Sequence, residues 1–288
     1  MPDKAISEID HLLTYVCDLD AAAALFRRMG FTLSPISRIE AMGISNHLVL
    51  MTPPTKGFAN YVELMAAHDR TTLPPPMVRT LSGGQGIKSM VLGAADIDVA
   101  QKAIAAAGFD IDAPFHIKRE WAIGPGESVF PEFDVILPVD APLVFNCCRY
   151  FNVDLYLRPE WLRHENGAQG LRRVIAVAND PVTVAGPFGA LFGHIPAPAG
   201  GALRTTPGQV ALDLMTPDAV KERYIIDVAP LERNAARYVG YVIEVASRKA
   251  LLGCLDRGKV PYRTLGDDIV VDPATGLGNL IVFTASQP

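Results

Sequence analysis

The 288-residue sequence predicts an α+β protein built from four copies of one βαβββ unit. One succession occurs four times along the chain: a short apolar run, an acidic or hydroxyl residue, a helix-length stretch and a glycine. Further short apolar runs of strand length follow each copy. A hydrophobic share of 49% is enough to fill the core that such an arrangement requires.

Each unit opens with a strand and a helix. The opening strands are expected at residues 9–16, 87–92, 171–177 and 238–245. The helices are expected to begin after Asp18, Asp96, Asp180 and Ser247 and to end near Gly30, Gly108, Gly193 and Gly258. An Asp or Ser side chain accepts hydrogen bonds from the unpaired amides of a first turn, and Gly adopts the left-handed conformation that ends a helix. Pro187 is expected to interrupt the third helix.

The remaining strands complete the units. They are expected at residues 32–38, 46–51 and 61–65, then at 115–121, 133–137 and 143–147, and finally at 208–215, 268–271 and 280–284. A proline-rich stretch and a glycine-rich segment at residues 83–86 separate the first two units. The four units form two halves, so we expect one domain at residues 1–150 and a second at 165–288.

Charge, hydropathy and cysteine content exclude several classes of protein. A formal net charge of -5 offers no basic surface for nucleic acid. No apolar stretch approaches the roughly 18–20 residues that cross a bilayer, and no secretory signal is apparent, so a cytoplasmic protein without membrane contact is expected. The four cysteines form no metal-type C-x-x-C pair. We therefore expect a protein that binds a small molecule.

Several short motifs make the chain resemble the vicinal oxygen chelate superfamily. These are Ile-Asp-His at residues 9–11, Met-Gly-Ile-Ser-Asn-His at 42–47, Tyr-Val-Glu-Leu at 61–64, Arg-Pro-Glu-Trp at 158–161 and His-Glu-Asn-Gly-Ala at 164–168. The superfamily includes glyoxalase I, extradiol dioxygenases, fosfomycin- and bleomycin-resistance proteins and methylmalonyl-CoA epimerase. The motifs are most similar to those of its glyoxalase-like domain branch. The resemblance implies that paired units form two cupped, barrel-like sheets.

The resemblance also implies a divalent-metal site in the first unit. In this superfamily the ligands project inward from the first and last strands of the units, which selects His11 and Glu63. Both residue types suit Fe²⁺, Mn²⁺, Zn²⁺ or Ni²⁺. A charged Glu in an otherwise apolar strand also requires a partner.

The other units depart from this ligand pattern. Ser89 stands where the second unit would carry its histidine, and Asn146, Tyr150 or a cysteine of the same closing strand remains a candidate to complete the metal sphere or to contact the substrate. In the second half, Arg173 and Gly240 replace the histidines. That half is therefore expected to be a structural duplicate or a substrate wall.

Three further residues are candidates for the site. His47 is a candidate third ligand or acid/base, and His164 a candidate catalytic residue on the connection between the halves. Arg119 is a candidate for binding a carboxylate or enolate oxygen of the substrate. Structural roles remain open for all three.

The resemblance leaves three functions open. The first is a metal-dependent lyase or isomerase that chelates vicinal oxygens of a small substrate. The second is an extradiol dioxygenase that cleaves a catechol-like aromatic, and the third is a metal-free drug-binding protein of the bleomycin-resistance type. An aromatic or mid-sized apolar ligand would suit a cavity with few fixed charges. Superfamily members are commonly dimers, so a homodimer remains open.

Overall fold

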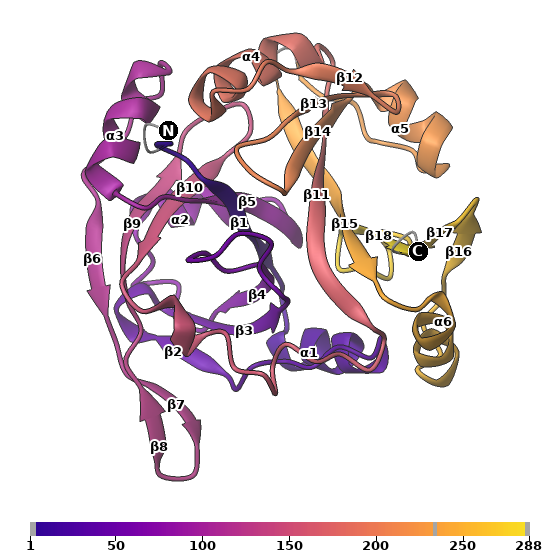
Figure 1. Cartoon of the computed structure of the whole chain (residues 1–288), viewed down its shortest axis with the longest axis horizontal. Helices are drawn as coiled ribbons and strands as arrows, with labels where there is room; N and C mark the ends of the chain where they lie inside the picture. The colour runs from indigo at the N-terminus through magenta and orange to yellow at the C-terminus, as the bar shows by residue number, and fades with distance from the viewer. Residues whose placement is uncertain (1–3, 233–234, 286–288) are drawn as a thin grey trace.

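The chain folds into two eight-stranded sheets of the same plan, each curled into a cup (Figure 1). The computed structural model describes residues 4–232 and 235–285. The first sheet has the order β2 (Ser37–Ile39), β3 (Ile44–Leu50), β4 (Tyr61–Ala67), β1 (Glu8–Tyr15), β5 (Gly86–Gly93), β10 (Phe145–Tyr150), β9 (Glu132–Val139) and β6 (Phe115–Lys118). A separate hairpin pairs β7 (Trp121–Gly124) with β8 (Glu127–Val129).

The second sheet repeats the first. Its order is β12 (Ala197–Ala199), β13 (Ala202–Thr205), β14 (Ala211–Met215), β11 (Ala168–Ala178), β15 (Ala236–Val245), β18 (Leu280–Ala285), β17 (Asp268–Val271) and β16 (Arg263–Leu265). In both sheets the central opening strand is parallel to one neighbour and antiparallel to the other: β1 with β4 and β5, β11 with β14 and β15. The predicted α+β class and the paired cupped sheets are confirmed.

Four helices begin where the sequence predicts. They are α1 (Leu19–Arg28), α3 (Ile97–Ala106), α4 (Pro181–Phe192) and α6 (Arg248–Arg257). The side chains of Asp18, Asp96, Asp180 and Ser247 each accept a hydrogen bond from a first-turn amide. The expected interruption at Pro187 is wrong, because α4 continues through it. Val184, Phe188 and Leu191 bury one face of α4 in the main core, which offsets the hydrogen bond that proline removes.

Two further helices lie in connections for which the sequence gives no helical pattern. The helix α2 (Pro75–Thr80) begins inside the proline-rich stretch, where Pro75 and Pro76 occupy its first turn and need no amide partner. The helix α5 (Pro217–Tyr224) begins at Thr216, whose hydroxyl accepts from the amide of Ala219. Each helix lies between the first and second units of its half. Two short 3-10 turns, η1 (Glu40–Met42) and η2 (Val153–Leu155), complete the elements of the described chain.

Buried polar contacts join the two halves. The carboxylate of Glu8 is fully buried and accepts hydrogen bonds from the amides of Gln209 and Val210, the latter at 2.8 Å. The side chain of Asn60 accepts from the amide of Leu171 at 2.7 Å and donates to its carbonyl. One apolar cluster also includes buried residues of both sheets. Each predicted domain range contains one complete sheet, while the division into separate domains stays a prediction.

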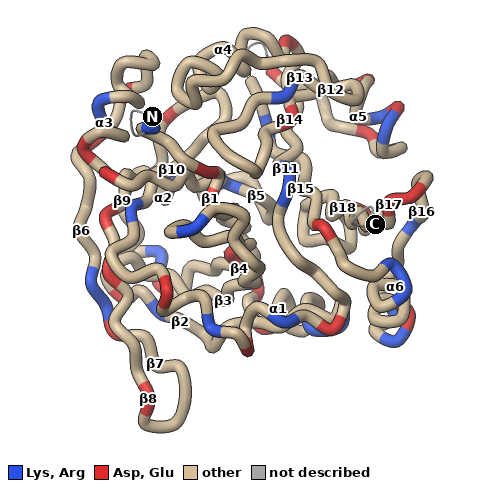
Figure 2. The backbone as a smooth tube through the Cα atoms, in the orientation of Figure 1, with Lys and Arg blue, Asp and Glu red and all other residues tan. Residues whose placement is uncertain are grey.

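The surface carries charges of both signs. Lys and Arg alternate with Asp and Glu over both halves, without a long stretch of positive charge (Figure 2). No helix among the described residues is long and apolar enough to cross a membrane.

Candidate functional site

The first sheet surrounds a cavity that opens to solvent, with about 710 Å³ of empty space when its open mouth is included. Most of its wall is apolar and includes Leu13, Ile44, Leu48, Met77, Phe133 and Leu137. Its polar residues are His11, Asn46, Tyr61, Glu63, Arg119, Asn146, Tyr150 and Tyr156. A concave, mainly apolar wall with a few polar groups is typical of a small-molecule site.

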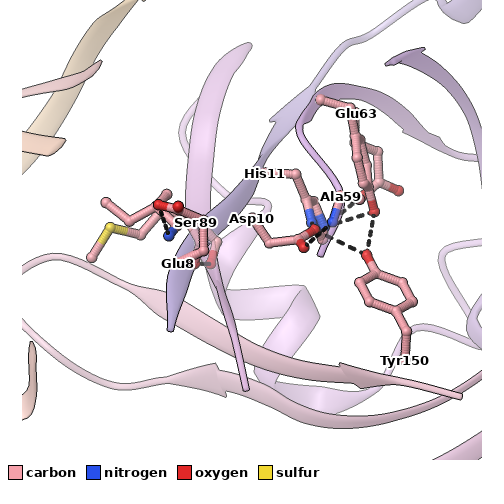
Figure 3. Close-up of polar contacts among 10 residues, drawn as sticks. Glu8, Asp10, His11, Ala59, Glu63, Ser89 and Tyr150 are labelled. Atoms are coloured by element: carbon pink, nitrogen blue, oxygen red, sulfur yellow. Dashed lines mark hydrogen bonds and ion pairs between the residues drawn. The ribbon is translucent and has the colours of Figure 1, made fainter. Parts of the chain in front are cut away.

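The structure brings the two predicted metal ligands together. The strands β1 and β4 are adjacent and parallel, with Leu13 opposite Glu63. His11 and Leu13 are two residues apart on β1, so their side chains share one face of the sheet with Glu63. His11 and Glu63 therefore both face the cavity. Their nearest atoms, Nε2 of His11 and Oε2 of Glu63, are 3.8 Å apart (Figure 3).

Asp10 holds the ring of His11. The Nδ1–H of His11 donates to Oδ1 of Asp10 at 2.7 Å, which assigns the ring proton to Nδ1 and leaves the lone pair on Nε2. Asp10 is fully buried and also accepts from the amide of Ala59 and the hydroxyl of Tyr150, at 2.7 and 3.0 Å (Figure 3). The pairing of β1 with β5 shifts between Ile9 and His11, which leaves Asp10 at a β-bulge. The bulge explains how two consecutive side chains can meet.

Tyr61 stacks on His11 without occupying its lone pair. The two rings are nearly parallel, 11° apart, with centroids separated by 4.0 Å. The Tyr61 hydroxyl lies 3.1 Å from Nε2 of His11 and 3.1 Å from the Tyr150 hydroxyl. Because stacked rings lie in separate planes, this hydroxyl is outside the imidazole plane, where the lone pair points. Burial, and then the nearby carboxylates, raise the pKa of both tyrosines, so their hydroxyls stay protonated.

Asn46 orients Glu63 from the neighbouring strand β3. Its side-chain Nδ2 donates to Oε1 of Glu63 at 2.6 Å, which leaves Oε2 directed toward His11. The Oδ1 of Asn46 is buried and has no hydrogen-bond partner. An unpaired buried acceptor in a cavity wall marks a position where a ligand can supply a donor.

The second unit has Ser89 and Asn146, which are poorer metal ligands, at the positions equivalent to His11 and Glu63. Asn146 lies opposite Val91 as Glu63 lies opposite Leu13, which settles the register of the closing strand. The hydroxyl of Ser89 donates to Oδ1 of Asn146, so these two side chains satisfy each other. Within residues 4–232 and 235–285, no three His, Cys, Asp or Glu side chains converge on one point. His11 and Glu63 are therefore the two ligand-type side chains that this part of the cavity wall brings together.

His47 and His164 lie outside the cavity lining. Nδ1 of His47 lies 2.8 Å from the carbonyl of Ser34, and burial lowers the pKa of its ring. Nδ1 of His164 accepts from the amide of Thr32 at 3.0 Å and its Nε2 donates to the carbonyl of Leu50 at 2.8 Å. Burial lowers the pKa of His164 as well. Both contact sets tie loops in place, so neither histidine enters the function proposed below.

Arg119 reaches the cavity from the connection between β6 and β7. Its Nε and Nη1 atoms are buried and have no hydrogen-bond partner. Its guanidinium lies 5.7 Å from the centre of the Trp121 ring. Tyr150 and Asn146, the other predicted substrate contacts, also line the cavity.

Asp10, Asn46 and Tyr61 lie within the sequence motifs, but the sequence assigns none of them a role in the site. Asp10 leaves the clearest signal, because two consecutive ionisable residues interrupt an otherwise apolar strand. The sequence could not show that a bulge turns both toward one site.

Comparisons with known proteins give a family and a fold. A family model described as a glyoxalase-like domain matches residues 9–192, which include all of the first sheet except Glu8. No curated protein sequence matches the chain significantly. Among solved structures, the chain is similar to a hypothetical protein from Staphylococcus aureus, with a TM-score of 0.68 and 11% identity over 96% of this chain and 98% of that one.

Two enzymes are among the other similar structures. A variant of 4-hydroxymandelate synthase from Streptomyces coelicolor has a TM-score of 0.62 and 13% identity over 98% of this chain and 93% of that one. A methylmalonyl-CoA epimerase from the same organism, in complex with 2-nitronate-propionyl-CoA, has a TM-score of 0.38 and 19% identity over 50% of this chain and 97% of that one. The synthase and the staphylococcal protein share the fold over nearly the whole chain.

Proposed function

We propose a function for this chain from one established premise: it belongs to the glyoxalase-like domain family. In our proposal the cavity of the first sheet is the active site of an enzyme that uses one divalent ion to chelate adjacent oxygens of a small substrate. Its reaction is of the lyase or isomerase type. The observation that carries this proposal is the convergence of Nε2 of His11 and Oε2 of Glu63 in the cavity wall, each held by a buried partner.

His11 and Glu63 would hold the ion. One nitrogen and one carboxylate ligand suit Fe²⁺, Mn²⁺, Zn²⁺ or Ni²⁺. Two protein ligands leave the remaining positions to water and to substrate oxygens, as chelation of the substrate requires. When bound, such an ion acts as a Lewis acid that stabilises negative charge developing on a substrate oxygen.

The chain's own residues prepare the site for proton transfer. Asp10 keeps the His11 proton on Nδ1, so that Nε2 faces the cavity with its lone pair. Because Tyr150 donates its one hydroxyl proton to Asp10, the protonated hydroxyl of Tyr61 is the group that can turn to donate a hydrogen bond to a substrate oxygen. In Glu63, Oε2 would hold the ion, and Oε1, which accepts one hydrogen bond from Asn46, keeps a second lone pair that can accept the proton of a carbon next to a carbonyl group. The apolar wall excludes water from the reacting atoms and strengthens these interactions.

A metal-free binding protein is the second candidate. This candidate is favoured by the hydrogen bond between Ser89 and Asn146, the residues equivalent to His11 and Glu63 in the second unit. Since these two side chains bind each other, the cavity has two ligand-type side chains instead of four. The dioxygenase alternative has less support. A site with two histidines and one carboxylate needs a second histidine, and His11 stands alone among the described histidines in lining the cavity.

Metal binding to the purified protein tests the proposal. The wild-type chain should bind one Mn²⁺ or Zn²⁺ per molecule in calorimetric titration, and His11→Ala and Glu63→Gln should each lose this binding. His116→Ala is the matched control, because His116 is an exposed histidine that also contacts two carboxylates, Glu132 and Asp134. Absence of ion binding to the wild type, or equal binding to the His11 and Glu63 variants, would favour the binding protein.

A further inference from the structure

We propose that Arg119 is the anchor for a carboxylate of the substrate. This inference rests on the proposed function and deepens it, because it names the class of molecule that the cavity accepts. The ligand is an organic monoanion with an apolar body: its carboxylate contacts Arg119, and its adjacent oxygens face His11 and Glu63.

Two of the three guanidinium nitrogens of Arg119 lack a hydrogen-bond partner within the described chain. Its Nε and Nη1 are buried without a hydrogen bond, and no carboxylate lies within ion-pair distance. Two buried guanidinium nitrogens without a partner are costly, since they lose water and gain no hydrogen bond in return. The neighbouring cation shows the contrast: Lys118 is exposed and pairs with Glu132 at 2.8 Å. An anionic ligand would satisfy Arg119 as Glu132 satisfies Lys118.

The position of Arg119 is fixed by its surroundings. Its backbone amide donates to the carbonyl of Pro131 at 3.1 Å, and its side chain lies beside the ring of Trp121. Trp121 is almost fully buried and donates through Nε1 to the carbonyl of Ile36. The guanidinium is therefore held against a rigid aromatic residue, which reduces the entropy lost when an anion binds.

The charges of the cavity favour a carboxylate over a phosphate. The only other formal charges at the described site belong to the carboxylates of Glu63 and, behind His11, Asp10. At the Arg119 end of the cavity one guanidinium balances one monoanion, whereas a phosphate dianion bound there would keep half of its charge uncompensated. A planar carboxylate also matches the planar guanidinium. The apolar side chains that line the same cavity, such as Ile117 and Phe133, would enclose a hydrocarbon or aromatic body.

Matched pairs of charged and uncharged probes test the assignment. Benzoate with benzamide, and phenylacetate with phenylacetamide, would be titrated into the protein by calorimetry and by ligand-observed NMR, with inorganic phosphate as a third anion. In the wild type each carboxylate should bind at least tenfold more tightly than its amide, and more tightly than phosphate. Arg119→Gln should abolish the preference, Arg119→Lys should retain part of it, and Lys118→Gln should leave it unchanged.

Several results would overturn the inference. They are equal binding of carboxylate and amide to the wild type, no binding of either, a preference that survives in Arg119→Gln, or tighter binding of phosphate. Thermal unfolding of each variant separates loss of binding from loss of fold, and Arg119→Lys remains informative if Arg119→Gln does not fold. Glu63→Gln separates the inference from the proposed function, since it should lose the metal ion and keep the carboxylate preference.

Discussion

The two cups share one topology and differ in what occupies them. In the first, the helix between the units, α2, contributes Met77 to the wall of an open cavity. In the second, the equivalent helix α5 buries Val220 and Tyr224 in an apolar cluster with Ile175 and Val282. The connection between equivalent strands therefore decides whether a cup is open or filled.

Equivalent positions on the central strands differ in the same way. The register places Arg173 and Asp213 of the second sheet where the first has His11 and Glu63. Nε of Arg173 lies 3.9 Å from Oδ2 of Asp213, close to the His11–Glu63 separation, and Arg204 forms two hydrogen bonds to the same carboxylate. An ion pair has replaced a pair of ligand-type side chains. The fold is retained while the chemistry differs, because chemistry depends on a few side chains placed on a common scaffold.

The largest effect on metal binding is expected when the residue types of Arg173 and Asp213 replace His11 and Glu63 in the first cup. In the double variant His11→Arg, Glu63→Asp the metal affinity measured by titration should fall by more than about a hundredfold, because a guanidinium has no lone pair to offer a metal. The cooperative thermal unfolding of this variant should persist. Metal binding equal to that of the wild type would show that these two positions do not distinguish the cups.

The filled and open cups should respond differently to loss of equivalent side chains. Ile175 is 0% exposed inside the second cluster, and its counterpart Leu13 is 6% exposed at the wall of the cavity. Ile175→Ala should lower the free energy of unfolding by about 4 kcal/mol, because it creates a new cavity, and Leu13→Ala by about 2 kcal/mol, because it enlarges an existing one. Urea unfolding measures both. Equal losses would argue against the contrast in packing.

The contact of Asp10 with His11 should strengthen metal binding without being essential to it. Asp10→Asn keeps the shape of the side chain but removes the charge that orients His11, so metal affinity should fall by about 10–100-fold. This loss should be smaller than in His11→Ala. Calorimetric titration measures it, and Asp96→Asn, which changes the cap of α3 far from the ligand pair, serves as the control. Unchanged affinity in Asp10→Asn would remove Asp10 from the site.

How far the sequence predicts this molecule depends on the range of each interaction. The helix starts at Asp18 and Asp96 follow from contacts within a few residues, so the pattern alone predicts them. The filling of the second cup by Tyr224 depends on packing between distant segments, and no local pattern announces it. The same holds for the site: the resemblance selects His11 and Glu63, whereas the Asp10 bulge and the unpaired nitrogens of Arg119 emerge only from the folded chain.

The smallest expected effect concerns acid stability, and it should begin in the first half. His47 and His164 have pKa values lowered by burial, and both bind the backbone of the first half, at Ser34, Thr32 and Leu50. When the folded pKa of a base is lowered, the unfolded chain binds more protons below its own pKa of about 6.5, so this stability is complete above pH 6.5 and declines as the pH falls.

Each of these histidines can contribute a slope of at most about 1.4 kcal/mol per pH unit. Protonation of His164 also removes the acceptor of the Thr32 amide, which releases the segment that leads from α1 to β2. Hydrogen exchange at pH 5.5 and 7.5 should show earlier acid-induced opening at residues 31–50 than in β14 and β15. His164→Asn should flatten the pH dependence of unfolding. Simultaneous opening of both sheets would show instead that the Glu8 and Asn60 contacts make the halves one cooperative unit.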